Sequence, residues 1–166
     1  MLLQTTLKMQ EPNIGNINFS FVVLFVFFFS CSQEPIPINY NHDQCDFCKM
    51  MISDPRYGAE IVTEKGKIYK FDSIECMPAF LRQVQMTNVN ILSFWVVDFN
   101  TPQKLINAYK AVYLHSKNLR SPMGLNLTAV NNQEAAQNLQ SRYQGQIISW
   151  AEVQLIVQEN WINKTP

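Results

Sequence analysis

One order of local structure, strand–strand–helix–strand, recurs in the two halves of this sequence and limits the folds open to it. In the first half, residues 57–63 and 68–71 favour strands and flank Lys65-Gly66, a pair typical of a hairpin turn. Apolar residues then recur at helical spacing over 74–85, and 91–99 is rich in aromatic and β-branched residues. The pattern predicts a small α+β module over about residues 45–100.

The second half, about residues 101–166, repeats this order less regularly. A helix begins at Asn131 or Asn132, which can cap it, and Gly145 stops it. The predicted segments are a short helical or irregular piece at 102–109, strands at 111–114 and 126–130, a helix at 131–143, a strand at 146–150 and a helix at 151–161. We therefore predict an α+β fold in which two small tandem ββαβ-like modules pack as one unit, residues 45–166.

The N-terminal 30 residues are interpreted as an export signal. Phe19 to Ser30 is an apolar run without charge, shorter than the roughly 20 residues that span a membrane as a helix and typical of a signal peptide. Cys31 follows directly, as in bacterial lipoproteins, where this cysteine carries the lipid. Residues 31–44 are rich in proline and asparagine, which indicates a flexible tether. We predict a membrane-anchored lipoprotein that faces the periplasm or the cell surface.

Charge and composition narrow the function. Lysine plus arginine equals aspartate plus glutamate, 13 each, so neither net charge nor a basic run indicates a nucleic-acid partner. The sequence has no recognisable nucleophile–base arrangement and no phosphate-binding glycine loop among its five glycines. We predict a binding and delivery protein rather than an enzyme.

Sulfur is concentrated in one short stretch. Cys45 to Met51 reads Cys-Asp-Phe-Cys-Lys-Met-Met, and Asp54-Pro55 after it favours a loop here. A second soft pair, Cys76-Met77, opens the predicted helix, and Met123 lies in a turn-like Ser-Pro-Met-Gly. Thiolate and thioether donors together favour Cu(I) over harder cations.

Five motifs in this order resemble the NosL family, the accessory lipoproteins of nitrous oxide reductase. They are Cys45-x-x-Cys48-x-Met50, Gly58-Ala59-Glu60, Phe71-Asp72-Ser73-Ile74-Glu75-Cys76-Met77, Ser121-Pro122-Met123-Gly124 and Ile147-Ile148-Ser149-Trp150. The resemblance covers Cys45 to about Val153. It implies tandem ββαβ-type modules, attachment to the periplasmic side of a membrane, and Cu(I) delivery to nitrous oxide reductase with its membrane-bound maturation machinery.

The resemblance also implies a ligand set. The family's Cys-x-Met motif falls on Cys48 and Met50, and its Met-Gly element makes Met123 a third candidate. Cys45 and Cys76 match only a subset of the family, so they could join the site or form a disulfide beside it. Met51 is a further candidate, whereas Met77 falls on the apolar face of its helix and is expected in the core.

Two other functions remain open on the sequence alone. Cys45-x-x-Cys48 could be the dithiol of an exported thiol–disulfide oxidoreductase, although such a pair normally opens a helix after a strand. Three cysteines with His42 or His115 could instead bind zinc, or the cysteines could form a structural disulfide in an interaction module. The sequence also leaves open whether copper is held by one chain or shared by a homodimer.

Overall fold

The computed structural model describes residues 34–83 and 89–163. All of these residues belong to one compact unit. The predicted signal peptide and Cys31 therefore lie outside the described residues. Within those residues, no helix has both the length and the apolar character needed to cross a membrane.

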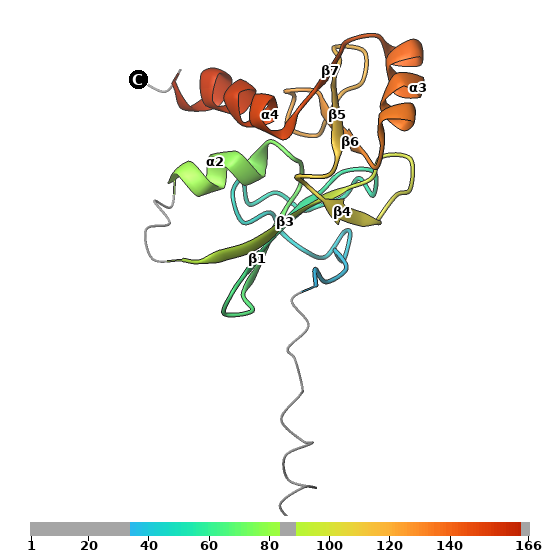
Figure 1. The fold of residues 1–166 in the computed structure, drawn as a ribbon. Helices are drawn as coiled ribbons and strands as arrows, with labels where there is room; N and C mark the ends of the chain where they lie inside the picture. The colour runs from blue at the N-terminus through green and yellow to red at the C-terminus, as the bar shows by residue number, and fades with distance from the viewer. Residues whose placement is uncertain (1–33, 84–88, 164–166) are drawn as a thin grey trace, which may run out of the picture. The chain divides into compact units, whose positions relative to one another are not determined.

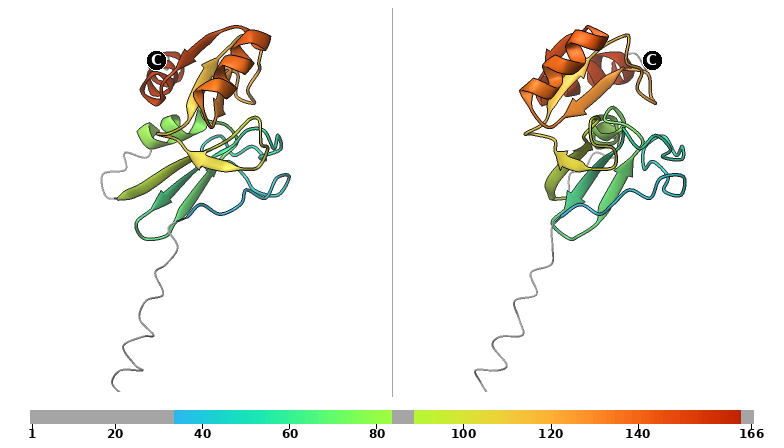
Figure 2. Two further views of the ribbon diagram at one scale, coloured as in Figure 1. Left: turned by 45° about the vertical axis from the view of Figure 1, so that its right-hand side comes forward. Right: turned by 90° about the vertical axis from the view of Figure 1, so that its right-hand side faces the viewer.

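The first half forms a four-stranded antiparallel sheet, in the order β2-β1-β3-β4. Its elements are β1 (Ala59–Thr63), β2 (Ile68–Phe71), helix α2 (Cys76–Gln83), β3 (Ile91–Val97) and β4 (Leu105–Asn107). β1 and β2 form the predicted hairpin, with Ala59 opposite Phe71 and Gly66 in the left-handed region at φ 77°. Helix α2 lies between this sheet and the second half of the chain (Figures 1 and 2).

The second half repeats this topology on a smaller scale. Its elements are β5 (Val112–His115), β6 (Leu127–Val130), helix α3 (Gln133–Tyr143), β7 (Gln146–Ile148), helix α4 (Trp150–Val157) and a π-helical turn η2 (Gln158–Ile162). The strand order β6-β5-β7 is equivalent to β2-β1-β3, because in both sheets the first strand pairs with the two that follow. The predicted α+β fold of two ββαβ-like modules is confirmed.

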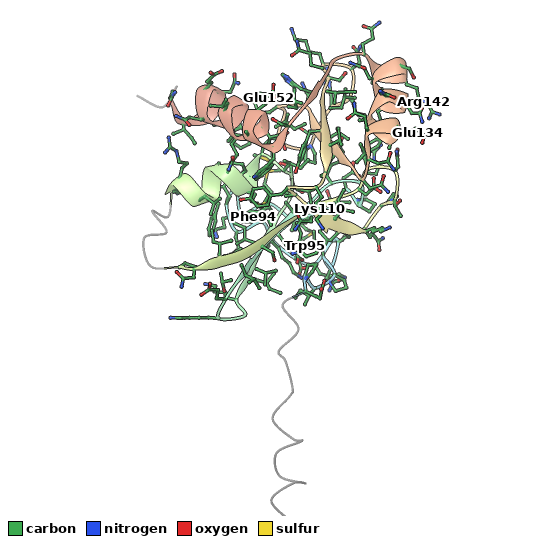
Figure 3. All side chains as sticks on the ribbon, in the orientation of Figure 1. Phe94, Trp95, Lys110, Glu134, Arg142 and Glu152 are labelled. Carbon is green, nitrogen blue, oxygen red and sulfur yellow. The ribbon has the colours of Figure 1, made fainter. Side chains whose placement is uncertain are left out.

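Both helices of the second half begin at a side-chain cap, and the cap of α3 is one of the two residues predicted. Asn132 Oδ1 accepts a hydrogen bond from the backbone N–H of Ala135 at 2.8 Å, and Ser149 and Glu152 form a capping box at the start of α4. Figure 3 shows Glu134 and Arg142 on the outer side of α3, whereas Leu139 of the same helix is buried. These helices are therefore amphipathic, as their sequence pattern indicates.

One local prediction is wrong. Residues 102–109 were expected to be helical or irregular, yet they contain β4, whose Leu105 pairs with Val97 and whose Ile106 pairs with Val96. A strand of three residues is too short to show alternation in the sequence, and its pairing with β3 determines its conformation. The first sheet consequently continues beyond residue 100.

A single apolar core joins the two halves. It contains Phe71 and Met77 from the first half and Tyr113, Leu127 and Trp150 from the second, all at most 6% exposed. Met77 is fully buried, which confirms its assignment to the core. A smaller cluster lies under α3 and includes Leu114 and Leu139. The two modules thus pack as one unit.

Part of the segment assigned to the tether lies against the first sheet. Ile38 is buried in the core, and the Tyr40 hydroxyl donates a hydrogen bond to the carbonyl of Tyr57 at 2.9 Å. The backbone N–H of Ile36 donates to Glu60 Oε2 at 3.2 Å. From Ile36 onward, the chain is thus in contact with the folded unit.

Candidate metal site

The sulfur-rich segment is a loop, as predicted, and backbone hydrogen bonds fix its shape. The N–H of Cys45 donates to the carbonyl of Met50 at 2.8 Å, and the N–H of Lys49 donates to the carbonyl of Cys45 at 3.0 Å. Lys49 has a left-handed φ of 63°, which turns the chain between Cys48 and Met50. The loop also pairs with β2, because the N–H of Asp46 donates to the carbonyl of Lys70 at 2.8 Å.

Three thiols meet where this loop contacts the start of α2. The Sγ atoms of Cys45, Cys48 and Cys76 all lie within 4.8 Å of one another. Cys45 and Cys76 are fully buried, whereas Cys48 is partly exposed, and all three are free thiols. Three sulfur donors at this separation could hold one metal ion.

The three thiols have different affinities for protons. A hydrogen bond from the Cys76 thiol lowers the pKa of Cys45 to about 5, although burial opposes the shift. The pKa of Cys76 is raised, first by its hydrogen bond to Cys45 and then by burial. Burial also raises the pKa of Cys48. Of the three thiols, Cys45 therefore loses its proton most readily, and the thiolate is the form that binds metals.

The candidate methionines lie in different environments. Met50 and Met51 are 53% and 51% exposed, and both follow Cys48 closely on the same loop. Met123 is partly buried and packs against the same core cluster as Cys45, Cys48 and Cys76. The structure thus brings three cysteines together, with two exposed methionines on the same loop and Met123 on the second module packed at the shared core.

Histidine does not join this cluster. Among residues 34–83 and 89–163, Cys45, Cys48 and Cys76 form the only group of three or more His, Cys, Asp or Glu side chains close enough to share a metal ion. His42 is exposed and His115 lies at the end of β5. A zinc site with a fourth, histidine ligand therefore has no support from the described residues.

The sequence does not predict a set of buried hydrogen bonds that fixes the position of the loop containing Met123. The Ser121 hydroxyl donates to Glu75 Oε1 and accepts a hydrogen bond from the N–H of Asn126 at 2.8 Å. The Tyr57 hydroxyl donates to the carbonyl of Arg120 at 3.0 Å. Glu75 immediately precedes Cys76, and Ser121 is two residues before Met123, so this connection joins two segments that carry candidate ligands.

Comparison with known proteins agrees with this arrangement. Residues 35–157 match the NosL family model. The fold is similar to that in "Crystal structure of the copper chaperone NosL from Shewanella denitrificans", with a TM-score of 0.62 and 21% sequence identity. The match covers 72% of this chain and 95% of the other. No curated protein matches the sequence.

Proposed function

Because this chain belongs to the NosL family, we propose that it is a membrane-anchored chaperone that binds Cu(I) and delivers it to nitrous oxide reductase during assembly of the copper centre. One observation carries the proposal: three free thiols, on a loop and on the helix beside it, lie within 4.8 Å of one another. Soft sulfur ligands select Cu(I), and the partly exposed Cys48 gives the cluster a side open to solvent.

The proposed ligands are Cys48, Met50 and Met123, with Cys45, Cys76 and Met51 as further donors. Thiolates supply negative charge, and thioethers add soft donors that stay unprotonated and form no disulfides. A mixed set favours release, because neutral thioethers exchange more readily than thiolates. The buried position of Cys45 and Cys76 supports a role as ligands that the solvent does not reach.

A lipid on Cys31 is proposed to anchor the exported protein, after removal of residues 1–30, at the periplasmic or cell-surface side of a membrane. Its partners there would be the reductase and the reductase's membrane-bound maturation machinery. Replacing Cys31 with serine should move the protein from the membrane fraction to the soluble fraction without changing Cu(I) binding. Retention in the membrane would contradict lipidation at this residue.

The dithiol oxidoreductase is the less favoured function. Thiol–disulfide exchange needs an accessible thiolate. Cys45, whose pKa is lowered, is fully buried, and Cys48, which is more accessible, has a raised pKa. Neither thiol is thus both accessible and readily deprotonated, which disfavours a redox pair, and we propose no enzymatic activity.

The function is tested by comparing Cys48→Ser with Cys45→Ser in the reduced protein. The parent should bind one Cu(I) per chain, or one per two chains if a homodimer shares the ion, and should prefer Cu(I) to Zn(II). Cys48→Ser should abolish high-affinity binding, whereas Cys45→Ser should keep part of it. Competition with a chromophoric Cu(I) chelator measures affinity, and copper loading of the reductase in cells measures delivery.

Thermal unfolding separates ligand loss from loss of structure. If Cys45 and Cys48 formed a structural disulfide, the protein unfolded without reductant would lose about 2–5 kcal/mol of stability from either substitution. Equal loss of reductase loading with unchanged Cu(I) affinity would favour the dithiol oxidoreductase. Tighter binding of Zn(II) than of Cu(I) by the parent would refute the copper proposal.

A further inference from the structure

The sulfur-containing residues of the loop and of the start of α2 differ in their exposure to solvent. Cys45 and Cys76 are 0% exposed, Cys48 is partly exposed, and Met50 and Met51 are 53% and 51% exposed. Cys48 therefore lies between buried thiols on one side and solvent-exposed thioethers on the other.

A copper ion held by the three thiols alone would be difficult for a partner to take. Copper passes between proteins when a ligand of the acceptor reaches the ion and displaces one ligand of the donor. Cys45 and Cys76 belong to the apolar core, so an acceptor could approach only from the side of Cys48. The buried cluster favours retention of copper over its transfer.

The two methionines have the opposite properties. Their backbone is held, because the carbonyl of Met50 accepts from the N–H of Cys45 and Met51 bridges to Gln44. Their side chains are large, apolar and half exposed, and burial in the core does not account for them. Methionine has three rotatable side-chain bonds and a polarisable sulfur, so a thioether two or three residues from Cys48 can reach an ion bound there.

We infer that the loop holds copper in two positions that share Cys48: an inner one with Cys45 and Cys76, and an outer one with Met50 and Met51. Copper enters and leaves through the outer position. This inference rests on the proposed function, since it concerns the path of the Cu(I) cargo.

The exchange between the positions is a change of ligands alone. The bonds from copper to Cys45 and Cys76 break, bonds to one or both thioethers form, and the bond to Cys48 is kept. Copper remains Cu(I) throughout, so no electron is transferred. The released sulfurs take up a proton from solvent where they return to thiols.

The test separates how tightly copper is held from how fast it leaves. The full-length protein is loaded with Cu(I) without oxygen, and bathocuproine disulfonate serves as the acceptor. Competition at equilibrium gives the affinity, and stopped-flow absorbance gives the transfer rate. The variants are Met50→Leu/Met51→Leu, which keeps bulk and removes both sulfurs, and Cys45→Ser. Ile36→Leu is the control, because Ile36 is an apolar residue of similar exposure, 47%, on another segment.

Removal of the thioethers should slow transfer more than it weakens affinity. We expect the double methionine variant to transfer copper about tenfold more slowly. Its affinity should stay close to that of the parent. Free N-acetylmethionine in excess should restore part of the rate. Cys45→Ser should instead lose affinity about 100-fold, since even partners outside a ligand set change metal affinity by about 10–100-fold. Its transfer should be no slower than the parent's.

Three results would overturn the inference. An unchanged transfer rate in the double methionine variant would show that copper leaves without the thioethers. A loss of affinity in that variant as large as in Cys45→Ser would indicate one mixed site instead of two positions. If Cys45→Ser binds Cu(I) as tightly as the parent, no inner position exists. If Cys45→Ser fails to fold, the same affinity measurement is made on Cys76→Ser. Failure of the proposed function is distinct, because then the parent itself would not prefer Cu(I).

Discussion

The hydrogen bond between Ser121 and Glu75 should stabilise the fold strongly for one side-chain pair. Glu75 is 0% exposed and Ser121 is 7% exposed. Glu75 Oε2 has no hydrogen-bond partner among the described residues, so Oε1 holds the only bond that the carboxyl group makes there. Ser121→Ala would remove this bond and leave the whole group buried without a partner.

The size of the effect follows from the two bonds that are lost. An unsatisfied buried polar group costs about 1–3 kcal/mol. The N–H of Asn126 also loses its acceptor, and because Asn126 is partly exposed, water can replace that bond at a cost of about 1 kcal/mol or less. Together these terms predict that Ser121→Ala lowers the free energy of unfolding by about 1–4 kcal/mol.

Urea unfolding of the metal-free protein, followed by far-UV circular dichroism, measures this change. Ser141→Ala is the matched control, because Ser141 is exposed on α3 and its hydroxyl bonds only to the carbonyl of Asn138 in the same helix. We expect that control to stay within about 0.5 kcal/mol of the parent.

A double variant tests the mechanism as well as the magnitude. In Ser121→Ala/Glu75→Met, neither polar side chain of the pair remains, and methionine has a volume similar to that of glutamate. This variant should be more stable than Ser121→Ala alone, because replacing both partners removes the unsatisfied carboxyl group. The reasoning is refuted if Ser121→Ala costs less than about 1 kcal/mol, or if the double variant is less stable than the single one.

Three further predictions concern other parts of the molecule. Gly58→Ala should destabilise the protein more than Gly66→Ala in urea unfolding. Both glycines have positive φ, but a Cβ at Gly58 would lie 2.7 Å from Ile38 Cδ1, whereas one at Gly66 would meet nothing within 4 Å. Equal effects of the two substitutions would contradict the close packing of Ile38. Burial raises the pKa of Glu60 from 4.5 to about 7, so the folded state binds more protons than the unfolded state between these values, and the stability present below pH 4.5 is lost as pH rises toward 7. Glu60→Gln should remove that part of the pH dependence, about 1–3 kcal/mol, and an unchanged stability–pH profile would contradict it. Met50→Leu, at an exposed position, should leave the melting temperature within about 2 °C of the parent. The same substitution should weaken Cu(I) binding or slow Cu(I) exchange. A large loss of stability would show that Met50 has a structural role.

The elements that the sequence predicts well are those with strong local signals. Lys65-Gly66 identifies the first hairpin and Asn132 the start of α3, because turns and caps depend on residues close in sequence. The cap of α4 is not predicted, since the sequence pattern assigns Ser149 and Trp150 to the preceding strand. β4 escapes prediction for the opposite reason. Leu105 to Asn107 become a strand only because β3 offers them an edge to pair with.

The candidate site is predictable only in part. The spacing of Cys45 and Cys48 identifies a sulfur-rich loop, but their approach to Cys76 depends on how α2 packs against that loop. The bond between Glu75 and Ser121 spans 46 residues of sequence, and no local pattern marks it. Participation of Met50 and Met123 in copper binding stays a prediction, since neither residue's thioether position follows from spacing alone.

The contact between the start of the folded unit and β1 has a consequence for where copper can be exchanged. The N–H of Ile36 bonds to Glu60, so the chain is held from this residue onward. If the lipid is on Cys31, as proposed, Ile36 is only five residues further along the chain, a distance of at most about 18 Å for a fully extended backbone. The domain would then remain near the bilayer surface, unable to travel to a distant acceptor. On this proposal, the copper recipient would have to come to the membrane.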